Sequence, residues 1–81
     1  MTEAVLKNVI FEILKTIAPE IDANSVSPTA NLREVLDIDS FDYLKLMIGL
    51  HEKLKIEIPE ADYPKLTTLG GLLQYLANKV P

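Results

Sequence analysis

Apolar residues recur at intervals of three and four over three stretches of the chain, which is the pattern of amphipathic helices. The first predicted helix starts after Thr2, a good N-cap, and runs to about Thr16 or Ile17. Ala18-Pro19 then ends it, because proline lacks an N–H and disfavours a helical residue before it. The predicted buried stripe of this helix consists of Val5, Leu6, Val9, Ile10, Ile13, Leu14 and Ile17.

A long loop is predicted over residues 18–39, where Asn, Ser and Pro favour turns. Leu32, Val35 and Leu36 form a short apolar patch that can pin this loop, and we expect one helical turn there. The second main helix begins at Asp39 or Ser40, since either side chain can cap it, and ends near Leu54 or Lys55. Its apolar line is Leu44, Met47, Leu50 and Leu54, widened by Leu46 and Ile48.

The remaining elements are an extended link over 56–59, a brief turn of helix over 60–63 before Pro64, and a last helix capped by Thr67 or Thr68. Its stripe is Leu69, Leu72, Leu73, Leu76 and Val80. No alternating apolar and polar run long enough for a sheet appears. The sequence therefore predicts an all-α fold, a four-helix bundle with three main helices, one short helix and a long first loop.

Length and composition fit one soluble domain over residues 1–81. With 81 residues the chain has room for one core, and 48% hydrophobic with 25% charged residues is typical of a folded domain. No run approaches the roughly 20 apolar residues of a membrane span, and the N-terminus lacks the layout of a secretion signal. We expect a cytoplasmic monomer without stable membrane insertion.

Charge and cysteine content narrow the partners and the chemistry. The net charge of -4 disfavours nucleic acid and suits a partner that presents Lys and Arg. The chain has no cysteine, so any thiol chemistry must arrive on a prosthetic group.

Ser40 at a predicted helix start is either a capping residue or a reactive group, and its position alone favours capping. The only histidine, His51, lies about 16 Å further along the same helix, too far to act as its base. We therefore do not expect an enzyme. The acids Glu34, Asp37, Asp39 and Asp42 lack the glycine turn and spacing of a calcium loop, so no metal site is assigned.

A serine that another enzyme modifies needs an exposed, recognisable surface. Acids dominate the stretch around Ser40, and Phe41 and Ile48 are apolar anchors if they are exposed, although both also suit a core. An acidic rim speeds the encounter with a basic partner. The predicted partner-binding residues are Asp37, Phe41, Asp42, Ile48 and Glu52.

Asp39-Ser40-Phe41 resembles the Asp-Ser-Leu phosphopantetheine signature of the acyl carrier protein family. An amphipathic helix through Leu54, then Ile58-Pro59-Glu60 and Thr67-Thr68-Leu69, match in order and spacing, so the resemblance covers about residues 32–77 in detail. It implies that a phosphopantetheinyl transferase attaches 4′-phosphopantetheine from coenzyme A to Ser40, with Asp39 in the same signature. The arm then holds acyl groups for acyl-loading, chain-elongating or acyl-transferring enzymes of fatty-acid, specialised lipid or polyketide synthesis.

The resemblance also implies an apolar interior that shelters the acyl chain, lined by Leu44, Met47 and Leu50. Two alternatives stay open: an aminoacyl or peptidyl carrier, and a non-carrier helical interaction module in which Ser40 is only a cap. Asp37 stands where many fatty-acid carriers have glycine, and Lys45 where glutamate is usual. With six acids against three lysines from Asp39 to Asp62, we expect weaker docking to a basic synthase and a specialised freestanding carrier with dedicated partners.

Overall fold

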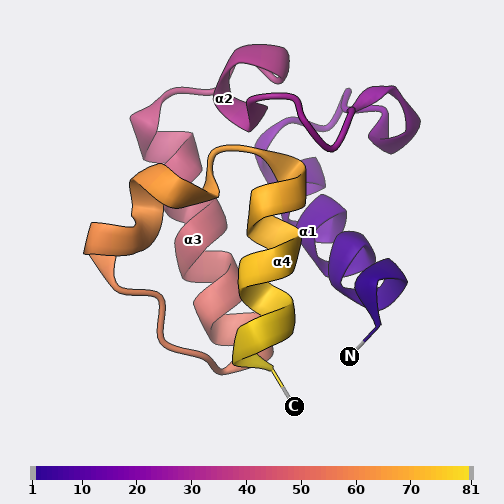
Figure 1. Cartoon of the computed structure of the whole chain (residues 1–81). Helices are drawn as coiled ribbons and strands as arrows, with labels where there is room; N and C mark the ends of the chain where they lie inside the picture. Colours follow the sequence, from indigo (N-terminus) through magenta and orange to yellow (C-terminus); the bar gives the residue numbers. More distant parts are fainter. Residues whose placement is uncertain (1, 81) are drawn as a thin grey trace.

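The computed structural model of the chain describes residues 2–80, and over these residues the fold is all-α, as predicted (Figure 1). Four α-helices and two short 3₁₀ segments follow one another, joined by loops. The only pairing of extended backbone among the described residues is an isolated bridge between Asn31 and Thr68. The elements are α1 (Glu3–Ile17), η1 (Ala23–Ser25), α2 (Leu32–Val35), α3 (Ser40–Leu54), η2 (Glu60–Leu66) and α4 (Leu69–Lys79).

The first helix has the predicted ends but a slightly rotated buried face. Thr2 caps α1 by accepting the Val5 N–H at 3.3 Å, and Ala18 ends the helix. Val5 was predicted in the buried stripe, and this is wrong, since its side chain is 45% exposed. Phe11, which the stripe omitted, is buried instead. The apolar face of α1 therefore centres on Leu6, Ile10, Phe11, Ile13 and Leu14.

The buried face of α3 also differs from the predicted line. Tyr43 is buried, whereas Leu44 and Ile48 are 40% and 45% exposed, so placing these two on the core line was wrong. Tyr43 is polar at its tip only, and its ring packs in the core while its hydroxyl finds a partner. The buried residues of α3 are Tyr43, Leu46, Met47 and Leu50.

The long first loop is anchored at both ends of its path. Val26, Leu32 and Ile38 are buried beneath it, and α2 supplies the predicted single helical turn. Val35 was expected to help pin this turn, but it is 49% exposed. Since Leu32 alone fills the core position of α2, the outward side of this short helix carries Val35.

Two backbone hydrogen bonds join this loop to the start of α4. The Leu32 N–H donates to the Thr67 carbonyl at 2.7 Å, and the Gly70 N–H donates to the Pro28 carbonyl at 2.8 Å. A Cβ on Gly70 would lie 3.0 Å from that same carbonyl oxygen, so a residue without a side chain permits this close approach. This close backbone contact explains why a glycine occupies position 70.

The segment after α3 is more helical than predicted. Ile56 and Ile58 of the link are buried, and η2 then continues through Pro64 to Leu66 instead of ending at Tyr63. Proline fits here because the short 3₁₀ segment needs few backbone donors and the fixed φ of proline suits it. Thr68 caps α4, and Val80, predicted in its stripe, is the buried C-cap.

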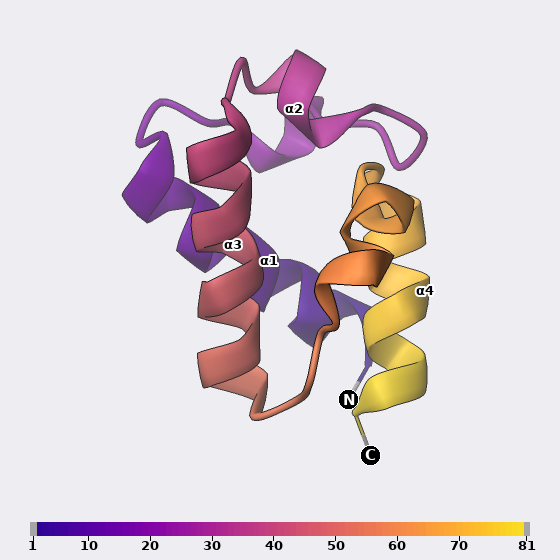
Figure 2. The same cartoon turned by 90° about the vertical axis from the view of Figure 1, so that its left-hand side faces the viewer.

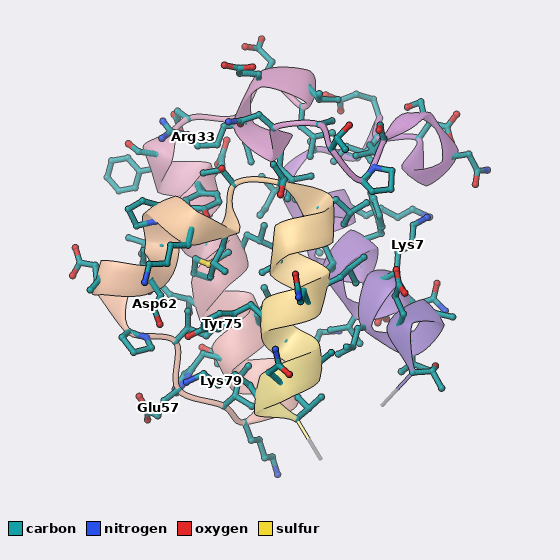
Figure 3. All side chains as sticks on the ribbon, in the orientation of Figure 1. Lys7, Arg33, Glu57, Asp62, Tyr75 and Lys79 are labelled. Carbon is teal, nitrogen blue, oxygen red and sulfur yellow. The ribbon has the colours of Figure 1, made fainter. Side chains whose placement is uncertain are left out.

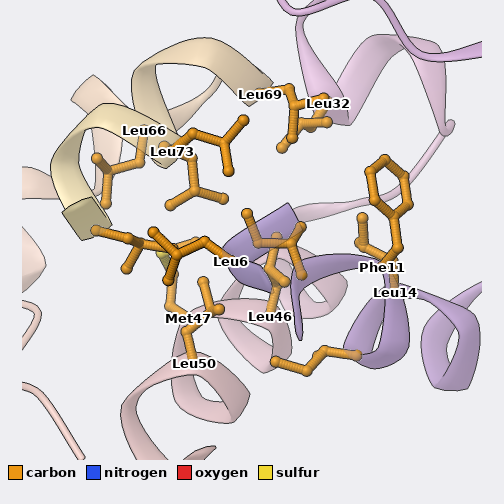
Figure 4. Packing of buried hydrophobic residues seen from close by; sticks show 14 of the residues in the cluster. Leu6, Phe11, Leu14, Leu32, Leu46, Met47, Leu50, Leu66, Leu69 and Leu73 are labelled. Carbon is orange, nitrogen blue, oxygen red and sulfur yellow. The ribbon is translucent and has the colours of Figure 1, made fainter. Parts of the chain in front are cut away.

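The helices enclose one leucine-rich core. Turned by 90°, Figure 2 shows α3 and α4 on opposite sides, η2 beside α4, and α2 across one end. Helix α1 packs against both α3 and α4. Figure 4 shows Leu6, Leu46, Met47, Leu50 and Leu73 from these helices meeting in the interior.

Gly49 of α3 lies against Ile13 of α1. A Cβ there would lie 2.9 Å from Cγ2 of the buried Ile13 side chain. The missing side chain at position 49 therefore permits the two helices to pack closely at this point.

We expect Lys55→Gly to stabilise the protein by about 0.5–1 kcal/mol, because Lys55 ends α3 with φ 54°, a left-handed conformation that favours glycine. Chemical denaturation of both proteins measures the difference. Lys53→Gly is the matched control, since Lys53 is helical and glycine there should cost about 1 kcal/mol. Destabilisation at position 55 would contradict the prediction.

Candidate functional site

Ser40 is the first residue of α3, and Asp39 is the N-cap. The Asp39 carboxylate accepts the Asp42 N–H at 2.9 Å, which satisfies one free donor of the first turn. The interpretation of Ser40 itself as the cap is therefore wrong. Ser40 is exposed, and none of the hydrogen bonds found within residues 2–80 uses its hydroxyl. That hydroxyl is thus left free at a fixed place on the surface.

The turn before Ser40 is held by the end of α2. The Ile38 N–H donates to the Arg33 carbonyl at 3.1 Å and the Asp37 N–H to the Glu34 carbonyl at 3.4 Å, the pair of bonds that defines a Schellman motif. Asp37 occupies its left-handed position with φ 51°, and aspartate tolerates this conformation better than most residues. A residue other than glycine thus still makes the sharp turn that leads into Asp39.

A cavity of about 330 Å³ opens beside Ser40, between α3 and η2. Phe41 at its edge is 73% exposed, so the question of whether Phe41 belongs to the core is settled in favour of the surface. Leu44, predicted in the acyl pocket, lines this cavity, whereas Met47 and Leu50 are fully buried in the core behind it. The cavity is lined by Ser40, Phe41, Tyr43, Leu44, Glu60 and Tyr63.

Tyr43, Glu60 and Tyr63 are the cavity residues that sequence reasoning missed, and Tyr43 is the buried one. Its hydroxyl donates to the Tyr63 carbonyl at 2.6 Å, and the two rings meet edge to face with centroids 6.4 Å apart. Burial raises the pKa of Tyr43 to about 12, although the nearby Arg33 charge acts in the opposite direction. The available signal was its position three residues after Ser40, which puts both on one helical face.

Arg33 lies over the outer side of Tyr43. Its guanidinium carbon is 5.9 Å from the ring centroid, within the range of a cation–π contact. Figure 3 shows Arg33 near the N-terminal end of α3, where Ser40 begins the helix. Arg33 is also the one basic residue between Lys15 and Lys45 in the sequence. It therefore places a positive charge close to the acidic stretch around Ser40.

The five predicted partner-binding residues fall into three places. Phe41 lies at the cavity beside Ser40, and Asp37 lines a separate hollow next to Arg33. The other three, Asp42, Ile48 and Glu52, line a groove of about 420 Å³ between α1 and α3.

That groove is not uniformly acidic. Lys45 lies 3.8 Å from the Asp42 carboxylate, and Lys53 of α3 lies 3.5 Å from the Glu12 carboxylate of α1. Both pairs are largely exposed, so each contributes little to stability. Their effect is to lower the net negative charge that the groove presents to a partner.

Neither His51 nor a metal centre adds a second site within the part of the chain that the structure describes. His51 is exposed, and its Nδ1–H donates to the Ile56 carbonyl beyond the end of α3, away from Ser40. Within residues 2–80, no group of three or more His, Cys, Asp or Glu side chains is arranged to hold a metal ion. Among the helices of the same residues, none is both long and apolar enough to cross a bilayer.

Comparison with known proteins adds an independent line of evidence. The family model described as "Phosphopantetheine attachment site" matches residues 5–76. An acyl carrier protein of Helicobacter hepaticus is 38% identical over 73 residues, covering 85% of this chain and 96% of the relative. Acyl carrier proteins of Picosynechococcus and Thermosynechococcus vestitus are 36% and 35% identical, covering 91% and 88% of this chain and 85% and 91% of the relatives.

Proposed function

This chain belongs to the acyl carrier protein family, and we propose that Ser40 is the residue to which its phosphopantetheine arm is attached. When bound, the arm supplies a terminal thiol that holds acyl groups as thioesters. This explains how a chain without cysteine takes part in thiol chemistry. Proteins of this family are carriers rather than catalysts, which agrees with a serine that the only histidine of the chain does not reach.

The assignment rests on the different roles of Asp39, which caps α3, and Ser40, which does not. Because Asp39 caps the helix, Ser40 is exposed and its hydroxyl remains available to a modifying enzyme. The adjoining cavity leaves room for the arm to lie against α3 and η2. Backbone N–H groups of the first turn and the positive end of the helix favour a phosphodiester there.

Attachment requires a partner because His51, the only histidine of the chain, bonds to the Ile56 carbonyl beyond the other end of α3 and does not reach Ser40. In the transfer, the Ser40 Oγ bonds to the phosphorus that carries the pantetheine of coenzyme A. The bond from that phosphorus to the bridging oxygen breaks, and adenosine 3′,5′-bisphosphate leaves with the electron pair. The transferase takes the hydroxyl proton. The contribution of this chain is to hold Oγ exposed at a rigid helix start.

For partner docking we propose the surface formed by Asp37, Phe41, Asp42, Ile48 and Glu52. The exposure of Phe41 and Ile48 supports their role as apolar anchors. The two lysine–carboxylate pairs in the groove reduce its acidity, which supports partners adapted to a mixed surface. Fatty-acid, specialised lipid and polyketide synthesis all use such carriers, and we propose that this chain serves one of them.

The test of Ser40 is an intact-mass measurement. The apo protein is incubated with coenzyme A and a broad phosphopantetheinyl transferase, and we expect wild type to gain one phosphopantetheine group. Ser40→Ala should gain none, since it removes the only proposed attachment oxygen. Ser27→Ala, an exposed loop serine, is the matched control and should gain the full mass. A mass gain on Ser40→Ala would place the attachment at another residue. The absence of a mass gain on wild type would contradict the carrier function.

A further inference from the structure

Of the six residues that line the cavity beside Ser40, only Tyr43 is buried, with 6% of its surface exposed. Since residues three apart share a helical face, Tyr43 lies one turn beyond Ser40 on the same face of α3. An acyl chain that enters from the arm therefore meets Tyr43 at the buried side of the cavity.

Tyr43 is fixed in this place by three contacts. Its hydroxyl donates to the Tyr63 carbonyl of η2 at 2.6 Å, and its ring meets the Tyr63 ring at an interplanar angle of 89°. Arg33 of α2 lies over the ring at 5.9 Å from its centroid. Contacts from η2 and α2 thus hold one rotamer, so moving the ring breaks a part-buried hydrogen bond and separates two packed rings.

The buried face of α3 continues beyond Tyr43 into the core. Met47 and Leu50 follow Tyr43 at spacings of four and seven, which continues the same helical stripe. Both are fully buried, and neither lines the cavity. The space that Ser40 opens onto is therefore separated from the interior lined by Met47 and Leu50.

We propose that Tyr43 determines acyl-chain specificity by limiting how deeply a chain can enter, so that this carrier shelters short acyl groups and leaves long ones in solvent. A cavity of roughly 150 Å³ accepts a six-carbon ring, so a cavity of about 330 Å³ that is open to solvent suits a chain of about eight carbons. The proposal rests on the proposed function, because only an arm on Ser40 delivers a chain to this cavity.

The experiment uses the full chain loaded with acyl groups of different length. Butanoyl, octanoyl and hexadecanoyl forms are made from the acyl-coenzyme A esters with a broad phosphopantetheinyl transferase, and intact mass confirms each product. Cleavage of the thioester by hydroxylamine then reports how exposed it is, and the methyl NMR signals of Met47 and Leu50 report how deep the chain reaches.

For wild type we expect hydroxylamine to cleave the octanoyl thioester about fivefold more slowly than the butanoyl thioester. This ratio corresponds to an octanoyl chain that lies inside the cavity about four-fifths of the time. Hexadecanoyl should be cleaved about as fast as butanoyl, because its chain stays in solvent, and the Met47 and Leu50 methyl signals should match those of the butanoyl form. Tyr43→Ala should protect hexadecanoyl and shift both signals. If the alanine variant does not fold, the same measurements are made on Tyr43→Leu, which keeps an apolar side chain.

Tyr75→Ala is the matched control, because it truncates a tyrosine of α4 that does not line the cavity. It should leave the chain-length profile of wild type unchanged. Wild-type protection of hexadecanoyl that equals or exceeds that of octanoyl, with shifted Met47 signals, overturns the role of Tyr43. Failure to load any acyl group appears already in the mass measurement and counts against Ser40 instead.

Discussion

Leu46→Ala should lower the free energy of unfolding by about 3 kcal/mol, because the truncation leaves a cavity in a fully packed core. Leu46 is completely buried in α3 and meets Leu6 and Met47 in the interior (Figure 4). A domain of 81 residues has a total stability of roughly 4–12 kcal/mol, so this loss is a large part of it. Urea denaturation at neutral pH measures the change.

Leu44→Ala is the matched control on the same helix. Leu44 is 40% exposed, so the same truncation should cost less than about 1 kcal/mol. The pair also distinguishes the observed buried face of α3 from the one predicted from sequence, which put Leu44 on the core line. Equal losses at positions 44 and 46 would contradict the described packing.

Raising the pH from 10 to 12 should remove about 2 kcal/mol of stability that depends on Tyr43. Burial raises the pKa of Tyr43 to about 12, against 10.0 for an ordinary tyrosine. The unfolded chain therefore releases this proton first, and the stabilisation, fully present below pH 10, is lost as the pH rises to 12. The pKa of Tyr75 is raised in the same direction by burial and by its hydrogen bond to Asp62.

Stability of wild type and Tyr43→Phe as a function of pH checks this prediction. At neutral pH the variant should be about 1 kcal/mol less stable, since the Tyr63 carbonyl loses its donor. Between pH 10 and 12 it should lose less stability than wild type. Tyr75→Phe tests the second group, which lies beside Asp62 of η2 (Figure 3), and parallel curves for all three proteins would contradict both assignments.

Sequence periodicity predicted the positions of the helices well, because periodicity depends on local spacing. Which face of a helix is buried depends instead on the other elements of the chain that pack against it. The ends of α1 and α3 follow from Thr2, Pro19 and Asp39, which act within one turn. The face that each helix buries is set by where α4 and η2 pack, and no local rule contains that information. The prediction consequently placed Leu44 in the core, whereas the structure buries the amphipathic Tyr43 there.

The site was partly predictable for the same reason. Ser40 and Asp39 form a local signature, so their place at the start of α3 could be read directly from sequence. Which of the two residues caps the helix could not be read from the sequence, because either side chain is able to cap a helix. The cavity needs Tyr63, twenty residues beyond Tyr43, and only the tertiary contact reveals it.

The two hydrogen bonds that tie the first loop to α4 make the modification of Ser40 depend on a distant helix. Pro28 and Leu32 find their backbone partners at Gly70 and Thr67, on the far side of α3 in the sequence. The loop that leads to Ser40 thus becomes fixed only after α4 has formed and docked. A transferase that recognises the folded surface will therefore require α4 to be in place before it modifies Ser40.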